Sequence, residues 1–357
     1  MSNESLTSLL TTGSAFSRMD EHGQAALEAT LSPRLDHFRQ GLDELAVALD
    51  QPTPTFSPRS AIAHSTYAPM RLSPDLRERA EALYLRLWDR SGASKRAIEE
   101  GLLTALGFTA DPASLPFWSQ IIGLSRPRDS FAGRRRVLAL AGLAHTALHC
   151  PKSAAHDALV GLTAHPLPDV RGRAIEALVA VSMDEEQNRD PSLAPLLHRI
   201  ATEDRAFAPR FLARGYLLAI DELPPLFKPD EVLAFEVTFG RASRTIELRA
   251  KQTLDDLHHA IQGAFEWDAD HLYAFYLTGE RDDPRFTLPN QEDDGAADIP
   301  LGALGFPTGH RFTYRFDFGD SNLFNVLVVG SSTAVRRAKY PRVIATKGKS
   351  PPQYRDW

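Results

Sequence analysis

Apolar positions in the first half of the chain recur every three or four residues, the spacing of one face of an α-helix. Phe38, Leu42, Leu45 and Leu49 show this pattern near the N-terminus, and the segments from 94 to 220 keep it. The pattern predicts an all-α N-terminal region.

Two proline-rich stretches interrupt the chain, with five prolines in residues 51–74 and three in residues 221–230. Proline lacks an N–H donor and fixes φ, so both stretches are predicted linkers. They separate N-terminal helices over 1–50, helical repeats over 75–220 and a C-terminal domain over 231–357.

The helical sequence between the two linkers contains repeated segments. Four helices begin with related sequences at arginines spaced 40, 37 and 37 residues apart, namely Arg96, Arg136, Arg173 and Arg210. A helix pair repeating about every 40 residues is typical of an α-solenoid. The stretch Pro168–Leu178 resembles the second helix of HEAT repeats, and Asp129 and Arg135 have the six-residue spacing of the Asp–Arg ladder of that family.

Beyond residue 230 the apolar period changes from 3.6 to 2. Leu233, Phe235 and Val237 alternate with polar residues, and a second alternating run follows a turn at Gly240, which predicts a β-hairpin. Thr253 is placed to cap the next helix. Further strands are predicted at 271–278, 285–288, 311–318 and 323–330, with an acidic loop at 291–298. The predicted fold class is thus an all-α HEAT-like solenoid followed by an α+β domain with a mostly antiparallel sheet that starts β-β-α.

Three stretches of the C-terminal domain, Thr253–Phe275, Phe312–Asp320 and Tyr340–Ile344, resemble the plasmid pRiA4b ORF-3-like family over about residues 231–355. The resemblance implies a compact α+β roll, an association with plasmids and transposon passenger genes, and no assigned activity. Its motif residues in this chain are His258, Trp267, His271, Asp317, Gly319 and Asp320.

The chain departs from the family pattern at two places. Asn322 and Phe324 stand where members commonly carry Trp and His, and Gln353 and Tyr354 replace two carboxylates. These departures indicate either that the site is not catalytic or that the protein is a divergent binder.

Composition adds limits on compartment and partners. The chain carries 40 basic and 46 acidic residues for a net charge of −6, and 43% of its residues are hydrophobic, as in globular proteins. The charge is uneven, because residues 252–320 are acidic and residues 331–357 are basic. A single cysteine, Cys150, and the lack of a long apolar run predict a cytoplasmic protein with no membrane segment.

The candidates for catalysis are weak. Asp317 and Asp320 could act as a carboxylate pair, but a strand ending in a turn explains them as well. The histidine spacing fits no zinc pattern, and His258 lies on the apolar face of its predicted helix. Cys150 follows His145 and His149 without an oxyanion motif. We expect no metal and no cofactor.

Arginines at equivalent helix starts form the strongest candidate for a binding site. In a solenoid they would line up along one surface and could grip phosphates, or they could tie adjacent repeats to acidic partners. The residues are Arg134, Arg136, Arg171, Arg173, Arg210 and Arg214.

Three functions remain open at this point. The first is a non-enzymatic interaction or scaffold protein of mobile genetic elements with a protein partner, which we favour. The second is a nucleic-acid-binding protein that uses the arginines and the basic tail 336–349. The third is a metal-dependent hydrolase centred on Asp317 and Asp320.

Overall fold

The chain forms two compact units in the computed structural model, residues 1–193 and residues 194–357. The structure describes residues 21–56, 62, 72–91, 94–124, 129–151, 153–183, 193–219, 227–278, 287–289 and 299–354. The predicted acidic loop 291–298, the chain before residue 21 and most of the linker 221–230 lie outside these ranges.

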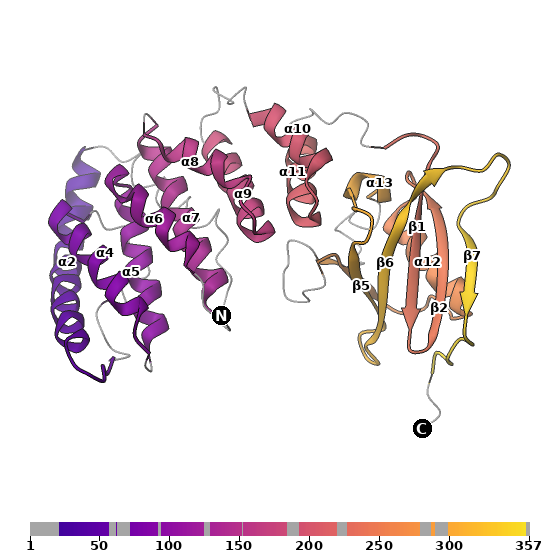
Figure 1. The fold of residues 1–357 in the computed structure, drawn as a ribbon, viewed down its shortest axis with the longest axis horizontal. Helices are drawn as coiled ribbons and strands as arrows, with labels where there is room; N and C mark the ends of the chain where they lie inside the picture. The colour runs from indigo at the N-terminus through magenta and orange to yellow at the C-terminus, as the bar shows by residue number, and fades with distance from the viewer. Residues whose placement is uncertain are drawn as a thin grey trace. The chain divides into compact units, whose positions relative to one another are not determined.

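The first unit is all-α within its described residues, as the apolar spacing predicts (Figure 1). Its helices are α2 (Glu21–Leu49), α4 (Pro74–Trp88), α5 (Lys95–Thr109), α6 (Leu115–Gly123), α7 (Ala132–His149), α8 (Ala155–Leu162) and α9 (Pro168–Met183), with a short 3₁₀ turn η1 (Pro112–Ser114) before α6. Pro74 occupies the first turn of α4, where its missing N–H has no intrahelical partner to lose.

Each helix in this unit packs on helices one or two places away along the chain. Helix α4 packs on α2 and α5, and α7 packs on α5, α6, α8 and α9. The close approach of α6 to α7 requires Gly142, because a Cβ there would come within 2.6 Å of the Trp118 ring. The sequence repeats predict this kind of local stacking for a solenoid.

The second unit combines two helices with a sheet. Its elements are α10 (Leu193–Glu203), α11 (Phe207–Ala219), β1 (Glu231–Phe239), β2 (Ala242–Arg249), α12 (Leu254–Phe265), β3 (Tyr273–Tyr276), β4 (Thr287–Pro289), α13 (Leu301–Leu304), β5 (Arg311–Phe316), β6 (Asn322–Thr333) and β7 (Arg342–Lys347). The α10–α11 pair, which the repeat spacing assigns to the solenoid, falls with the sheet except for Leu193.

Two contacts explain why α11 belongs to the second unit. The Phe207 ring stacks on Phe306 and His310 at centroid distances of 5.2 and 4.5 Å. The buried Arg214 guanidinium donates through Nη1 to the carbonyl oxygen of Gly302 at 2.8 Å. The boundary between the units therefore precedes α11 rather than lying at 221–230.

The described strands form one antiparallel sheet of seven strands in the order β4-β3-β5-β6-β1-β2-β7. The predicted hairpin is confirmed, with Phe235 opposite Ile246 and a turn at Gly240, whose φ is +58°. The predicted cap is also confirmed: Thr253 and Asp256 form a reciprocal capping box at the start of α12.

Helix α12 and the sheet enclose an aromatic core. The apolar face of α12 supplies Leu254, Leu257, Ile261 and Phe265, all fully buried. Opposite strands contribute large buried rings, namely Phe235, Tyr273, Phe275, Phe312, Tyr314, Phe316 and Phe324.

The segment after β7 is tied back to this core. The buried Arg244 guanidinium donates to the carbonyl oxygens of Ala264, Lys347 and Gly348 and to Ser350 Oγ, at 2.7–3.2 Å. Trp267 Nε1 donates to the Pro351 carbonyl oxygen at 2.8 Å. These bonds fix residues 347–351 against the end of α12.

Candidate functional site

The candidate arginines of the first unit contact internal partners. Arg134 Nη2 lies 2.6 Å from Glu100 Oε1, and Arg173 Nη1 lies 3.2 Å from Glu176 Oε2. Arg171 donates to the carbonyl oxygens of His165 and Pro166 at 2.9 and 3.1 Å.

Arg136 Nε, like Arg173 Nε, is buried and has no hydrogen-bond partner within the described chain. Burial of His165 lowers its pKa, and the charge of Arg136 lowers it further. Most of the predicted row in this unit is thus engaged within the fold.

The Asp–Arg ladder is present at Asp129 and Arg135. Arg135 is almost completely buried, and its Nη1 lies 2.6 Å from Asp129 Oδ2 while its Nε donates to Tyr84 Oη at 3.0 Å. Its guanidinium also stacks on the Trp88 ring at 4.2 Å. Burial alone would lower the pKa of Arg135, but the Asp129 carboxylate reverses this and holds it above its ordinary value.

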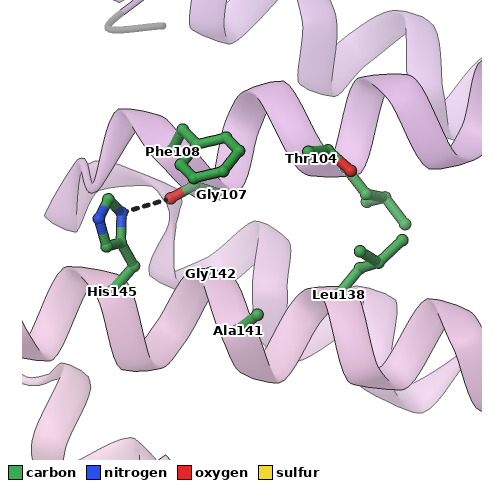
Figure 2. A pocket seen from close by; sticks show the side chains of 8 residues that line it. Thr104, Gly107, Phe108, Leu138, Ala141, Gly142 and His145 are labelled. Carbon is green, nitrogen blue, oxygen red and sulfur yellow. Dashed lines mark hydrogen bonds between the residues drawn. The ribbon is translucent and has the colours of Figure 1, made fainter. Parts of the chain in front are cut away.

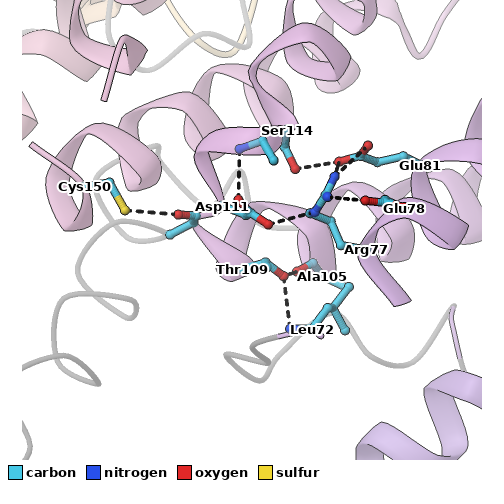
Figure 3. Close-up of polar contacts among 11 residues, drawn as sticks. Leu72, Arg77, Glu78, Glu81, Ala105, Thr109, Asp111, Ser114 and Cys150 are labelled. Carbon is cyan, nitrogen blue, oxygen red and sulfur yellow. Dashed lines mark hydrogen bonds and ion pairs between the residues drawn. The ribbon is translucent and has the colours of Figure 1, made fainter. Parts of the chain in front are cut away.

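A second buried arginine, which the sequence analysis missed, organises the start of α4 (Figure 3). Arg77 contacts three carboxylates, with N···O distances of 3.0 Å to Glu78, 3.2 Å to Glu81 and 2.8 Å to Asp111. Glu81 also accepts a hydrogen bond from Ser114 Oγ at 2.5 Å. The network joins α4 to the η1 turn that precedes α6.

The remaining two candidate arginines lie in the second unit. Arg214 donates to the carbonyl oxygens of Ala201, Gly302 and Ala303 at 2.8–3.3 Å. Burial, with a smaller effect of Arg210, lowers the pKa of Arg214 to about 10. Arg210 Nε is buried without a hydrogen-bond partner in the described residues, and burial lowers the pKa of Arg210 although Asp204 opposes it.

A small hollow between α5 and α7 is lined almost wholly by apolar groups (Figure 2). At one end His145 Nδ1 lies 3.0 Å from the Gly107 carbonyl oxygen and therefore carries a proton. His145 Nε2 is then the acceptor for His149 Nε2, 2.9 Å away. Cys150 Sγ contacts the Ala110 carbonyl oxygen at 3.5 Å, a structural contact at a helix end.

Among the family motif residues, His258 is confirmed to be buried, as its place on the apolar face of α12 predicts. Its Nδ1 lies 2.6 Å from Tyr314 Oη, and the same oxygen accepts from Gln262 Nε2 at 2.7 Å. Tyr314 therefore donates its proton to Nδ1, which places the imidazole proton on Nε2. Burial, followed by the nearby His259, lowers the pKa of His258 to about 4.

Two other motif residues, His271 and Asp317, meet at the surface where β3 begins and β5 ends, whereas Trp267 is buried. His271 Nε2 lies 3.7 Å from Asp270 Oδ1 and 3.8 Å from Asp317 Oδ2. Asp270 Oδ2 accepts a hydrogen bond from Tyr354 Oη at 2.8 Å, and this bond holds the pKa of Asp270 below its usual range and raises that of Tyr354. We call this group the motif surface: Asp268, Asp270, His271, Leu272, Asp317, Phe318, Gln353 and Tyr354.

The residues that replace the family carboxylates serve this surface. Gln353 accepts from the Asp268 amide at 2.7 Å and donates to Asp270 Oδ1 at 3.1 Å. Sequence periodicity had no means of finding these contacts, because the partners are more than eighty residues apart. Asn322 and Phe324, at the other departure from the family pattern, are both buried at the start of β6.

Asp317 shapes the turn that follows β5. Its Oδ1 accepts from the amides of Gly319 and Asp320 at 2.8 and 3.3 Å, and its own backbone is left-handed with φ of +55°. Asp320 is exposed and contributes its amide rather than its carboxylate to these bonds. The two acids thus form a turn cap, not a facing pair.

Apolar side chains lie beside these acids. Leu272 is 63% exposed and Tyr354 51%, while Phe318, adjacent to Asp317, is 43% exposed. Exposed apolar side chains beside charged groups are typical of a surface that binds another molecule. In the part of the chain that is described, no group of three or more His, Cys, Asp or Glu side chains is arranged to hold a metal ion.

Comparison with known proteins bears on the domain that carries this surface. Residues 236–354 match the model of the family described as plasmid pRiA4b ORF-3-like protein. The C-terminal domain belongs to this family. The resemblance seen in the sequence is thereby confirmed for the pRiA4b ORF-3-like domain, and the match ends at Tyr354 of the motif surface.

One matching solved structure is the crystal structure of a protein of unknown function, MM3350, from Methanosarcina mazei Go1. It is 21% identical, covers 35% of this chain and 74% of that chain, and has a TM-score of 0.31. None of the curated proteins compared with the chain matches it. Within the described residues, no helix has the length and apolar character needed to cross a membrane.

Proposed function

We propose that the chain is a non-enzymatic interaction protein that binds a protein partner through the motif surface. The observation that carries the proposal is the exposure of Leu272, Phe318 and Tyr354 beside the carboxylates of Asp270 and Asp317. A partner with basic and apolar side chains would complement this surface.

The other two functions have less support. The hydrolase needs Asp317 and Asp320 to face each other, whereas the Asp317 carboxylate caps a turn. The nucleic-acid function needs free arginines, whereas Arg134, Arg173 and Arg214 hold internal partners.

The proposal also includes an association with mobile genetic elements and a cytoplasmic location. The name of the matching family refers to a plasmid, which supports an association with mobile genetic elements. The single thiol of Cys150 supports a location in the reducing cytoplasm.

Photo-crosslinking in cells that express the full chain tests the proposal. A benzoylphenylalanine at Phe318 is expected to give adducts that resist nuclease and are digested by protease. The same residue at Val47, 64% exposed on α2 in the other unit, is the matched control and should give few. Adducts destroyed by nuclease, or equal yields from both positions, would contradict the proposal.

A further inference from the structure

The last strand of the sheet has one unpaired edge. Strand β7 pairs with β2 and ends the strand order, and no other described strand pairs with its outer edge. Every residue from 343 to 349 is exposed. A free edge of this kind presents backbone N–H and C=O groups that can pair with an added strand.

The edge also carries apolar side chains. Val343 and Ile344 are 45% and 49% exposed. The pairing with β2 shifts register between Thr245 and Ile246, so that Ile344 has no partner there and forms a bulge. An added strand would cover the two apolar side chains as well as the backbone groups.

The charge around this edge has one sign. Residues 335–349 contain six basic and no acidic side chains. Arg342 forms an ion pair with Glu247 at 2.6 Å, and none of the other five basic residues has an ion pair within the described chain. Lys347 and Lys349 therefore leave positive charge at the exposed end of the edge.

We propose that β7 binds an acidic, extended peptide segment of a partner protein as an eighth strand. Backbone pairing would hold the peptide, Val343 and Ile344 would contact its apolar side chains, and Lys347 and Lys349 would select acidic ones. This goes beyond the proposed function, because the motif surface is acidic and lies at β3 and β5, which are separated from β7 by other strands in the sheet order.

A second copy of the chain fits this edge less well. Two β7 strands paired antiparallel about their midpoint would place Arg342 of each opposite Lys347 of the other. Like charges directly opposite each other destabilise a strand pair. Charge complementarity therefore favours an acidic segment over self-association.

The test measures binding of fluorescent seven-residue peptides to the full chain by anisotropy. The probes are a peptide of alternating valine and glutamate, its valine–lysine counterpart and a single-stranded oligonucleotide. Two further versions of the acidic peptide carry N-methyl groups on the valine or on the glutamate amides, which blocks one or the other edge of its strand. Strand addition uses one edge, so one methylated peptide should bind and the other should not.

Ile344→Asp should weaken binding of the acidic peptide about tenfold or more, and so should the double variant Lys347→Glu with Lys349→Glu. Arg311→Glu, an exposed site on β5, is the matched control and should change it little. Unchanged thermal melting shows that the variants fold, and the methylated peptides test the proposal on the unaltered chain.

Several outcomes would overturn this assignment. Equal binding of both methylated peptides, or binding unaffected at Ile344 and Lys347, places the peptide elsewhere and leaves the motif-surface proposal standing. A dimer abolished by Ile344→Asp would assign the edge to self-association. If the oligonucleotide binds more tightly than the acidic peptide, and the Lys347→Glu and Lys349→Glu pair abolishes that binding, the ligand of the edge is nucleic acid. That result alone leaves the proposed function of the motif surface intact, because only nuclease-sensitive adducts at Phe318 would overturn it.

Discussion

Buried arginines are used differently in the two units. In the helical unit, Arg77 and Arg135 contact carboxylates, and both have a pKa above the ordinary value although burial opposes this. In the sheet unit, Arg214 donates to main-chain carbonyl oxygens, and burial lowers its pKa to about 10. The helical unit compensates a buried charge with an opposite charge, whereas the sheet unit uses the charge to satisfy carbonyl groups.

The difference follows from what each unit has to join. Stacked helices saturate their own backbones, so side chains such as Asp129 and Glu99 must provide the acceptors between repeats. Short elements such as α13 and the segment after β7 leave carbonyls without partners, and Arg214 and Arg244 reach them.

The largest expected effect comes from removing the helices that share the sheet unit. A fragment of residues 194–357 should unfold cooperatively, whereas 231–357 should be less stable by at least about 4 kcal/mol, because removing one core Phe ring alone costs about 3–5 kcal/mol. The shorter fragment lacks the Phe207 ring that stacks on Phe306 and the Arg214 guanidinium that binds the Gly302 carbonyl. Urea unfolding of both fragments measures this, and equal stability would return the boundary to 221–230.

Replacing one arginine in each unit sharpens the comparison. Arg135→Met should cost about 3–5 kcal/mol, because it removes the ion-pair partner of Asp129 and leaves the buried Glu99 with Lys95 alone. Arg214→Met should cost about 1–3 kcal/mol, because it leaves only carbonyl oxygens unpaired.

Hydrogen exchange of α7 and β1 amides under urea reports the two units separately. The loss of unfolding free energy caused by Arg135→Met should be smaller at acidic pH, where the Asp129 and Glu99 carboxylates are protonated. Arg134→Ala, at a more exposed arginine, is the control. A larger destabilisation by Arg214→Met would contradict the distinction.

His258 should make the sheet unit sensitive to pH. The unfolded chain binds its proton near pH 6.5 and the folded chain near 4, so between these values the unfolded state binds more protons. The contribution, up to about 3 kcal/mol, is complete above pH 6.5 and is lost as the pH falls towards 4. His258→Gln should remove this slope from β1 exchange, and the exposed His37→Gln should not.

The smallest effect is expected at the turn after β5. Asp317→Asn should lower stability by about 1 kcal/mol, because the amide oxygen is a weaker acceptor for the Gly319 N–H. Asp320→Asn should change it less. Thermal melting checks both, and stoichiometric metal in the purified protein, absent from either variant, would instead favour the hydrolase.

Much of the fold was predictable, because local patterns determine it. Alternation predicted the β1–β2 hairpin, Thr253 predicted the start of α12, and the motif text predicted the family. Strand β7 was missed, because an exposed edge strand has no buried face and therefore no alternation.

The site was only partly predictable. The motif text named Asp317 and His271, but the contacts of Tyr354 depend on a chain reversal that no short-range signal encodes. Arg77 and Arg135 were hard to recognise as core residues, since an arginine is seldom buried unless a distant acid meets it. The equal spacing of related segments placed α11 with the helical repeats, whereas in the structure α11 groups with the sheet.

The bonds of Arg244 have a consequence for the synthesis of this domain on the ribosome. Its strand is made early in the domain, yet its acceptors at Lys347, Gly348 and Ser350 are made about a hundred residues later. In a nascent chain that has reached only β6, the Arg244 guanidinium can bind the carbonyl oxygens of Ser243 and Ala264 but lacks its three later acceptors. Native closure of the sheet has to wait until translation has passed Ser350.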